Sequence, residues 1–280
     1  MNRYVFLRTV TRTLLWSCLI LGAGWSMFPI AFVIGSSLKV PNEIFAYPPN
    51  LLFVPTQQNY VDLTQDWPGF WNSLANSGVI TVSAIALTLA VALPAAYAYS
   101  RFSGHRGVKP SGLFITAARM FPPVALSIPL FPFLRTVGLI DRHITLIILY
   151  SVFYITIATW ILKSFLDSIP RELEENAQID GCSKLGAFIR ITIPLVSPGL
   201  IAASALVAIF SWNEFFFAFL FTGTRAVTAP VVLQEMLGAM FGVSWGPLFA
   251  ATTIQLMPVL IALWGIQKFL LRGAAFGGLR

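Results

Sequence analysis

Residues 165–198 read FLDSIPRELEENAQIDGCSKLGAFIRITIPLVSP and form a polar island between two long apolar runs. Five of the eleven acidic residues of the chain lie in this island: Asp167, Glu172, Glu174, Glu175 and Asp180. In a chain that is 57% hydrophobic and 10% charged, such a concentration of charge indicates a segment that lies in water. We therefore expect the island to dock onto a partner.

The island predicts two short amphipathic helices joined at a glycine. Ser168 can cap the first helix, Pro170 suits its first turn, and the following glutamates favour the positive end of the helix dipole. Gly181 is expected to end this helix. Ser183 then opens a second helix, which we expect to end near Pro194.

The rest of the chain predicts an all-α polytopic membrane protein. Six runs approach the roughly 20 residues that cross a ~30 Å hydrocarbon core; they cover 13–38, 67–100, 110–134, 144–162, 191–213 and 236–267. The third run contains Arg119 and four prolines, so its helix is expected to kink or unwind. The fifth helix is expected to begin after Pro198. The sequence thus predicts six transmembrane helices and no soluble domain.

Lysine and arginine placement predicts the orientation. These residues gather at both chain ends, in the 101–109 loop and in the island, and are sparse in the intervening segments. By the positive-inside rule both termini and the island are cytoplasmic. Topology therefore accounts for the net charge of +7, which is no argument for nucleic acid as a partner.

The spacing of Glu175, Asn176, Ala177, Gly181, Ile191, Ile193 and Pro194 resembles the "EAA" loop of ABC importer permeases. That pattern is E-A-A, three residues, G, nine residues and I-x-L-P. Asn176 replaces the first alanine, and Ile193 replaces the leucine. Further similarity lies in the helix start NSL at 72–74, in AYAYSR at 96–101, in WNE at 212–214 and in the C-terminal QKFLLRGAAFGGLR, which ends at Arg280. The resemblance points to the carbohydrate branch of that family.

This resemblance implies a type I ABC importer permease fold in a bacterial inner membrane. Residues 1–71 are then an N-terminal transmembrane helix with an external loop, and 72–280 are the permease core. The implied partners are a nucleotide-binding ATPase dimer, a second permease subunit and an extracytoplasmic substrate-binding protein. The implied contacts to the ATPase are Leu173, Glu175, Ala177, Gly181, Leu185 and Phe188. ATP and Mg²⁺ would bind to the ATPase, and no cofactor to this chain.

Four polar or aromatic residues in or next to the apolar runs are candidates for a substrate pathway. Arg119 lies either within the bilayer or at its cytoplasmic interface, where its side chain would reach water. Trp212, Asn213 and Glu214 together suit a sugar, because an indole stacks on a pyranose face while an amide and a carboxylate meet hydroxyls. The alternative is an internally paired packing cluster, with Glu214 bonded to Arg119.

No feature of the sequence indicates an enzyme. It contains no phosphate-binding G-x-x-x-x-G-K-[ST] loop, no nucleophile elbow and no zinc spacing, and His143 has no second ligand nearby. We therefore expect neither catalytic residues nor a metal site. An ATP-independent secondary transporter and a membrane scaffold remain alternatives, and within the family sugars, polyols and glycerol-phosphate all remain open as substrates.

Overall fold

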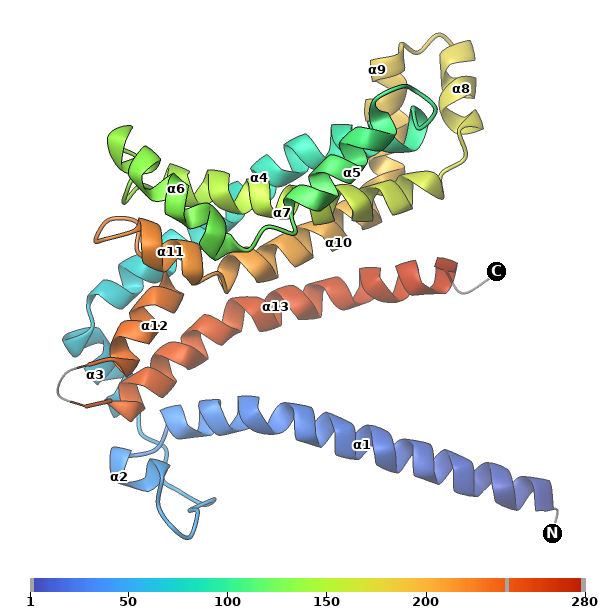
Figure 1. The fold of residues 1–280 in the computed structure, drawn as a ribbon. Coiled ribbons are helices and arrows are strands. Elements are labelled where there is room, and N and C mark those ends of the chain that lie inside the picture. Colours follow the sequence, from blue (N-terminus) through green and yellow to red (C-terminus); the bar gives the residue numbers. More distant parts are fainter. Residues whose placement is uncertain (1–2, 240–241, 278–280) are drawn as a thin grey trace. The chain divides into compact units, whose positions relative to one another are not determined.

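The computed structural model describes residues 3–239 and 242–277, with side chains for 11–239 and 242–264. In this part of the chain every regular element is helical (Figure 1). The helices are α1 (Arg3–Ser37), α2 (Pro41–Ile44), α3 (Gln58–Asp66), α4 (Gly69–Arg101), α5 (Val108–Ala118), α6 (Pro123–Thr136), α7 (His143–Asp167), α8 (Glu172–Ile179), α9 (Lys184–Ala187), the π-helical turn Phe188–Thr192, α10 (Ile193–Trp212), α11 (Phe216–Phe221), α12 (Ala229–Leu237) and α13 (Trp245–Gly277). The end of the C-terminal similarity, at Arg280, lies outside the described residues.

Five helical segments of the described chain are long and apolar enough to cross a membrane. They are Thr11–Ser37, Gly69–Arg101, His143–Asp167, Lys184–Trp212 and Trp245–Trp264. A sixth span results if α5 and α6 are taken together, although the two helices are bent by 89° at their break. This break confirms the irregular third helix, because Pro122 and Pro123 lie at the break after α5 and Pro123 opens α6.

The chain divides into two compact units, and the first comprises Met1–Phe70 and Glu235–Leu256. Within it, Asn59 is fully buried and donates from Nδ2 to the carbonyls of Ser37 and Lys39 at 2.8 and 2.7 Å. The aromatic ring of Phe45 packs edge-on against the ring of Trp245, with centroids 5.0 Å apart. These contacts give the segment between α1 and α4 a fixed path.

The second unit, Trp71–Gln234 and Met257–Arg280, holds two apolar cores. One core joins α4, α7 and α11 through Ile80, Tyr150 and Phe221, and the other joins α4, α7 and α10 through Ala96, Leu162 and Val207. Figure 1 shows α4, α7 and α10 running along one another. A Cβ on Gly199 would lie 2.7 Å from the Phe165 ring, so α10 needs glycine there to approach α7.

Three predicted boundaries are wrong. Ser168 does not cap α8, because its hydroxyl donates to the carbonyl of Phe165 at 2.7 Å and so completes the end of α7. The helix that follows Ser183 does not end at Pro194. It widens into the π-helical turn, where the Ile193 N–H donates to the Phe188 carbonyl, and then continues as α10. The fifth membrane helix therefore begins before Pro198, which lies inside it.

Candidate functional site

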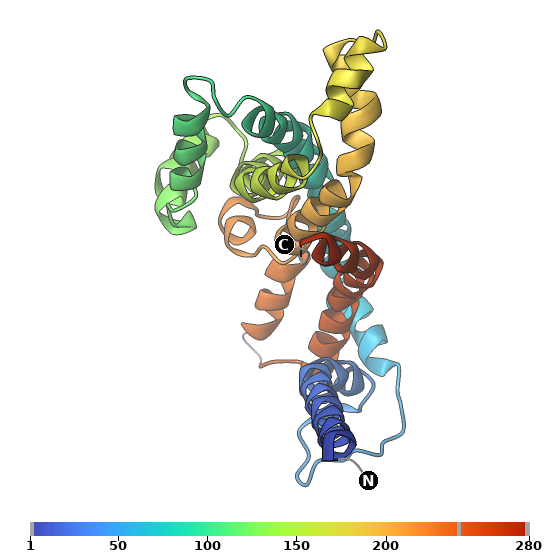
Figure 2. The same ribbon diagram turned by 90° about the vertical axis from the view of Figure 1, so that its right-hand side faces the viewer.

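The helix pair α8–α9 lies at one end of α7 and α10, and the turn at Gly181 sets its shape (Figures 1 and 2). Gly181 has φ +92°, a left-handed conformation that favours glycine. Its N–H donates to the carbonyl of Gln178 at 3.1 Å, and the Cys182 N–H donates to the carbonyl of Ala177 at 2.9 Å. These two bonds form a Schellman motif that satisfies the last carbonyls of α8. The sequence-predicted stop is thus confirmed in its geometry.

Ser183 begins α9 as predicted. It is in an extended conformation, and its Oγ accepts a hydrogen bond from the Gly186 N–H at 3.0 Å. This is the usual bond between an N-cap side chain and the third residue of a helix. Only two residues, Gly181 and Cys182, separate the end cap of α8 from this N-cap, so both sides of the turn are specified.

The helix pair carries exposed apolar side chains although it is otherwise polar. Leu173, Ile179, Leu185 and Ile189 are 43%, 82%, 66% and 51% exposed. Glu175 is exposed beside them. A group of large apolar side chains on a charged segment is typical of an interaction surface. We call Leu173, Glu175, Ile179, Leu185 and Ile189 the open face of the helix pair.

Two of the six predicted contact residues pack inside the chain. Ala177 is 9% exposed. Phe188 is half-buried and meets the ring of Tyr97 edge-on, with centroids 4.7 Å apart. Phe188 therefore holds the helix pair on α4 and Ala177 is covered, while Leu173, Glu175 and Leu185 remain accessible.

A buried ion pair fastens α8 to the end of α4. Arg101 donates to Glu174 Oε1 through Nε at 2.9 Å and Nη2 at 2.8 Å, and the two side chains are 8% and 7% exposed. The Tyr97 hydroxyl donates to the other carboxylate oxygen at 2.7 Å. Arg101 also bonds the carbonyls of Leu166 and Ile169. We call Tyr97, Arg101 and Glu174 the Glu174 brace.

Charged and polar groups support the Glu174 brace. The Ser100 hydroxyl donates to Asp167 at 2.6 Å, and Arg171 Nη2 donates to the Ser100 carbonyl at 2.8 Å. Burial alone would raise the pKa of Glu174, but the hydrogen bonds from Arg101 and Tyr97 outweigh it, and the pKa lies below its usual value. Glu174 is therefore ionised at neutral pH, and the ion pair is fully charged.

No sequence pattern pairs Glu174 with Arg101. Glu174 is one of several glutamates that favour the positive end of the helix dipole, and Arg101 belongs to AYAYSR and to the basic 101–109 loop. A signal was present, since Glu174 lies three residues before Ala177 and so shares the buried side of α8. No sequence pattern, however, indicates that the end of α4 meets that side.

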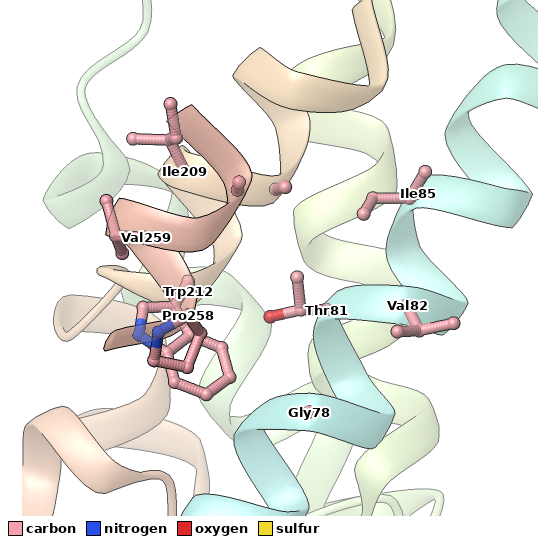
Figure 3. Close-up of a pocket in the computed structure, with 10 residues that line it drawn as sticks. Gly78, Thr81, Val82, Ile85, Ile209, Trp212, Pro258 and Val259 are labelled. Carbon is pink, nitrogen blue, oxygen red and sulfur yellow. The ribbon is translucent and has the colours of Figure 1, made fainter. Parts of the chain in front are cut away.

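A cavity of about 220 Å³ lies in the second unit between α4, α10 and α13 (Figure 3). The indole of Trp212 and the side chain of Thr81 face it, with Pro258 beside the indole. Thr81 Oγ1 is buried and has no hydrogen-bond partner within the described part of the chain. None of the lining side chains is charged. The cavity thus combines one large aromatic face with one available hydroxyl.

The other predicted pathway residues lie away from this cavity. Asn213 is exposed and donates to the Ile209 carbonyl at 2.8 Å. Glu214 accepts from the N–H groups of Phe217 and Ala218 at 2.9 and 3.3 Å, so it caps α11. Arg119 is exposed at the end of α5. The suggested Arg119–Glu214 pair is absent from the ion pairs of the described residues.

Comparison with known proteins assigns the chain to a family. Residues 89–275 match the profile of the binding-protein-dependent transport system inner membrane component. The chain belongs to this family. It is 34% identical to the sulfoquinovosyl glycerol transport system permease protein SmoH of Agrobacterium fabrum, over 91% of this chain and 89% of that protein. It is 31% identical to the trehalose/maltose transport system permease protein MalG of Thermococcus litoralis, over 91% of each chain.

A solved structure supports the same fold. A chain of a bacterial ABC transporter involved in the import of the acidic polysaccharide alginate superimposes with a TM-score of 0.77, at 23% identity, over 96% of this chain and 98% of that one. The permease fold expected from the EAA-like spacing is therefore confirmed. This permease is a multi-pass inner-membrane protein of an ABC importer.

Proposed function

We propose that this permease forms half of the translocation pathway of an ATP-driven importer for sugars or related polyols. A second permease subunit completes the pathway, and an extracytoplasmic binding protein delivers the solute. ATP and Mg²⁺ bind to a separate ATPase dimer, and both termini of this chain are cytoplasmic. The relatives named above support the sugar class, because one is named for sulfoquinovosyl glycerol, which carries a sugar group, and the other for trehalose and maltose.

The observation that carries the coupling role is the open face of the helix pair. It exposes four apolar side chains together with Glu175, so a cleft on the ATPase can bury apolar surface while it pairs with the carboxylate. The other side of the pair is fixed on the membrane helices by the Glu174 brace. A partner that moves the open face therefore moves α4, α7 and α10 with it.

The cavity at Trp212 supports a neutral solute. An indole ring stacks on the apolar face of a sugar, and the Thr81 hydroxyl offers one hydrogen bond. The absence of charge in the lining favours sugars and polyols over glycerol-phosphate, whose phosphate requires cationic partners. Of the four pathway candidates only Trp212 gains this support. Arg119, Asn213 and Glu214 remain predictions.

Site-specific cross-linking tests the coupling role. Leu185→Cys places a thiol on the open face, and Val152→Cys is the matched control, because both side chains are 66% exposed and Val152 lies on the membrane helix α7. Cross-linking in native membranes is followed by mass spectrometry. A P-loop ATPase attached at residue 185 and absent at residue 152 is the expected result. Equal labelling at both positions, or no ATPase at either, contradicts the proposal.

Substrate class is tested separately by uptake in cells. A deletion strain complemented with this importer is given labelled neutral sugars, polyols and glycerol-phosphate. Trp212→Leu keeps an apolar side chain but removes the aromatic face, and it is expected to lower uptake of a sugar several-fold. Uptake of glycerol-phosphate alone would overturn the sugar assignment.

A further inference from the structure

Asp141 binds the loop 222–228 through its backbone. It lies in the turn between α6 and α7, and its two carboxylate oxygens accept hydrogen bonds at 2.9–3.1 Å from four consecutive N–H groups, those of Gly223, Thr224, Arg225 and Ala226. Its own N–H donates to the Phe221 carbonyl at 2.9 Å. Asp141 has φ +60°, a left-handed conformation that is uncommon outside glycine. Four amides on one carboxylate fix the loop from a single side chain.

The charge of Asp141 is matched to this role. Burial alone would raise the pKa of its carboxyl group, but the hydrogen bonds from the Ala226, Gly223, Thr224 and Arg225 amides outweigh it and hold the pKa far below the usual range. The ionised form, which accepts at both oxygens, is therefore the one present at neutral pH.

A second set of contacts holds the same loop on α4. Asn76 Nδ2 donates to the carbonyls of Arg225 and Val227, both at 2.9 Å. Its Oδ1 is therefore the acceptor in the 2.7 Å contact with His143 Nε2, and His143 carries a proton on that nitrogen. Ser77 Oγ accepts from the Ala229 N–H at 2.9 Å. We call Asn76, Ser77, Asp141 and His143 the Asp141 clasp.

The Asp141 clasp and the Glu174 brace lie at opposite ends of the same two helices. Asn76 and His143 are near the starts of α4 and α7, whereas Arg101 and Leu166 are at their ends. Between them the two apolar cores join α4 to α7, and Ser151 Oγ donates to the Ala84 carbonyl at 3.3 Å. The pair is thus fastened to α8 at one end and to the 222–228 loop at the other.

We propose that Asp141 is a positioning residue that fixes the 222–228 loop on the α4–α7 pair, so that the loop moves as one body with α8. This inference rests on the proposed function: with both termini and the helix pair cytoplasmic, the 222–228 loop at the other end of α4 and α7 is external, on the side from which the binding protein delivers the solute. Because packed helices shift as units, a movement of α8 driven by the ATPase reaches the loop without loss in a flexible joint. In the reverse direction, a binding protein bound at the loop changes the preferred position of α8.

The test uses the complete importer in nanodiscs. Asp141→Asn is nearly isosteric, but it turns one acceptor oxygen into an NH₂ group that faces backbone N–H donors. Asp66→Asn is the control, since Asp66 is an exposed acid on α3. Amide hydrogen exchange of residues 222–228 is measured by mass spectrometry. It is expected to accelerate by about tenfold or more in Asp141→Asn, because several hydrogen bonds are lost together, and not in Asp66→Asn.

The functional readout is ATPase stimulation by the importer's own binding protein, identified by copurification. Asp141→Asn is expected to raise the binding-protein concentration that gives half-maximal stimulation by about tenfold, as loss of a preformed contact surface does. Basal ATPase activity and the cross-link at residue 185 are expected to stay unchanged. A raised half-maximal concentration with unchanged basal activity and cross-linking distinguishes a positioning role from a general loss of fold.

A second pair of variants keeps the test decisive if Asp141→Asn does not assemble. His143→Gln retains an N–H donor toward Asn76, whereas His143→Leu does not, so only the leucine variant is expected to accelerate exchange in the loop. Slow exchange in both Asp141→Asn and His143→Leu overturns the proposal, as does fast exchange with an unchanged half-maximal concentration. If an importer whose only change is Leu185→Cys shows neither the cross-link to the ATPase nor stimulation by the binding protein, the proposed function is contradicted instead.

Discussion

The two ends of the α4–α7 pair are fastened by different chemistry. At the α8 end, the Glu174 brace joins two charged side chains that are both more than nine-tenths buried. At the 222–228 loop, the Asp141 clasp joins one carboxylate to backbone amides, and the loop residues 223–225 are exposed. Each contact holds a surface that is proposed to bind a partner protein, and both surfaces are held on the same two helices.

The difference determines what each end tolerates. A buried ion pair depends on both partners, because removing one leaves an uncompensated charge away from water. A carboxylate on backbone amides depends on a single side chain, since any residue except proline supplies the N–H groups. The Glu174 brace is therefore the more vulnerable end, and the loop of the Asp141 clasp is free to vary in sequence.

The largest effect is expected from Glu174→Gln. The substitution removes the carboxylate charge that is paired with the buried Arg101, which destabilises by about 3–5 kcal/mol. We expect loss of uptake and a clear fall in the thermal unfolding midpoint in detergent. The double variant Arg101→Met with Glu174→Met removes both charges and should recover much of the stability, since such replacements are often neutral.

Glu172→Gln is the control for this substitution, because Glu172 is exposed in the first turn of the same helix. If Glu172→Gln and Glu174→Gln lowered the unfolding midpoint equally, the buried ion pair would not be what fastens α8. Uptake by the Arg101–Glu174 double variant then separates stability from coupling. A stable double variant that still fails to transport would indicate that the geometry of the Glu174 brace matters as well as its strength.

A smaller effect on stability is expected from Gly181→Val. Nothing lies within 4 Å of a Cβ built on Gly181, so the cost comes from the left-handed backbone alone and is about 1–2 kcal/mol. Because the turn sets the angle of α9 to α8, we expect uptake and substrate-stimulated ATPase activity to be lost while membrane insertion persists. Gly104→Val is the matched control, since its Cβ is equally free and its φ is not left-handed. Unchanged transport in Gly181→Val would remove the docking role of the helix pair.

Sequence reasoning found the features whose chemistry is local. The Gly181 stop and the Ser183 cap each depend on residues within five positions, and the EAA-like spacing lies within one loop. The break in the third helix follows from Pro122 and Pro123. Those features fix the fold class and the place of the helix pair.

The missed features depend on contacts between distant segments. Arg101 and Glu174 are 73 residues apart, and Asp141 meets amides 82 to 85 residues further along the chain. Backbone amides carry no sequence signal, so the Asp141 clasp was not predictable from any motif. Ser168 was misassigned because one hydroxyl suits either the end of α7 or the start of α8, and only the helix path decides between them.

Lowering the pH tests whether Asp141 is the titrating group that holds the 222–228 loop. The pKa of folded Asp141 lies below its value in an unfolded chain, about 3.9, so its stabilisation is fully present above that pH and is lost as the pH falls through the lower folded value. We therefore expect exchange in the 222–228 loop, corrected for the intrinsic pH dependence of amide exchange, to stay slow from pH 7 to pH 5. Loss of protection within that window would show that the loop is held by another titrating group.

Of the substitutions, Glu214→Gln is expected to have the smallest effect. Like Asp141, Glu214 is a carboxylate that accepts hydrogen bonds from backbone amides, so the two sites can be compared. Glu214 accepts from only two N–H groups, and glutamine retains one carbonyl oxygen for the 2.9 Å bond from Phe217. The loss is then mainly the interaction of the charge with the α11 dipole, about 0.3–1 kcal/mol. Uptake should keep its half-saturating solute concentration, whereas a several-fold rise in that concentration would place Glu214 on the pathway. Since Asp141→Asn removes an acceptor from a set of four amides, a larger stability loss in Glu214→Gln than in Asp141→Asn would contradict the ranking of the two sites.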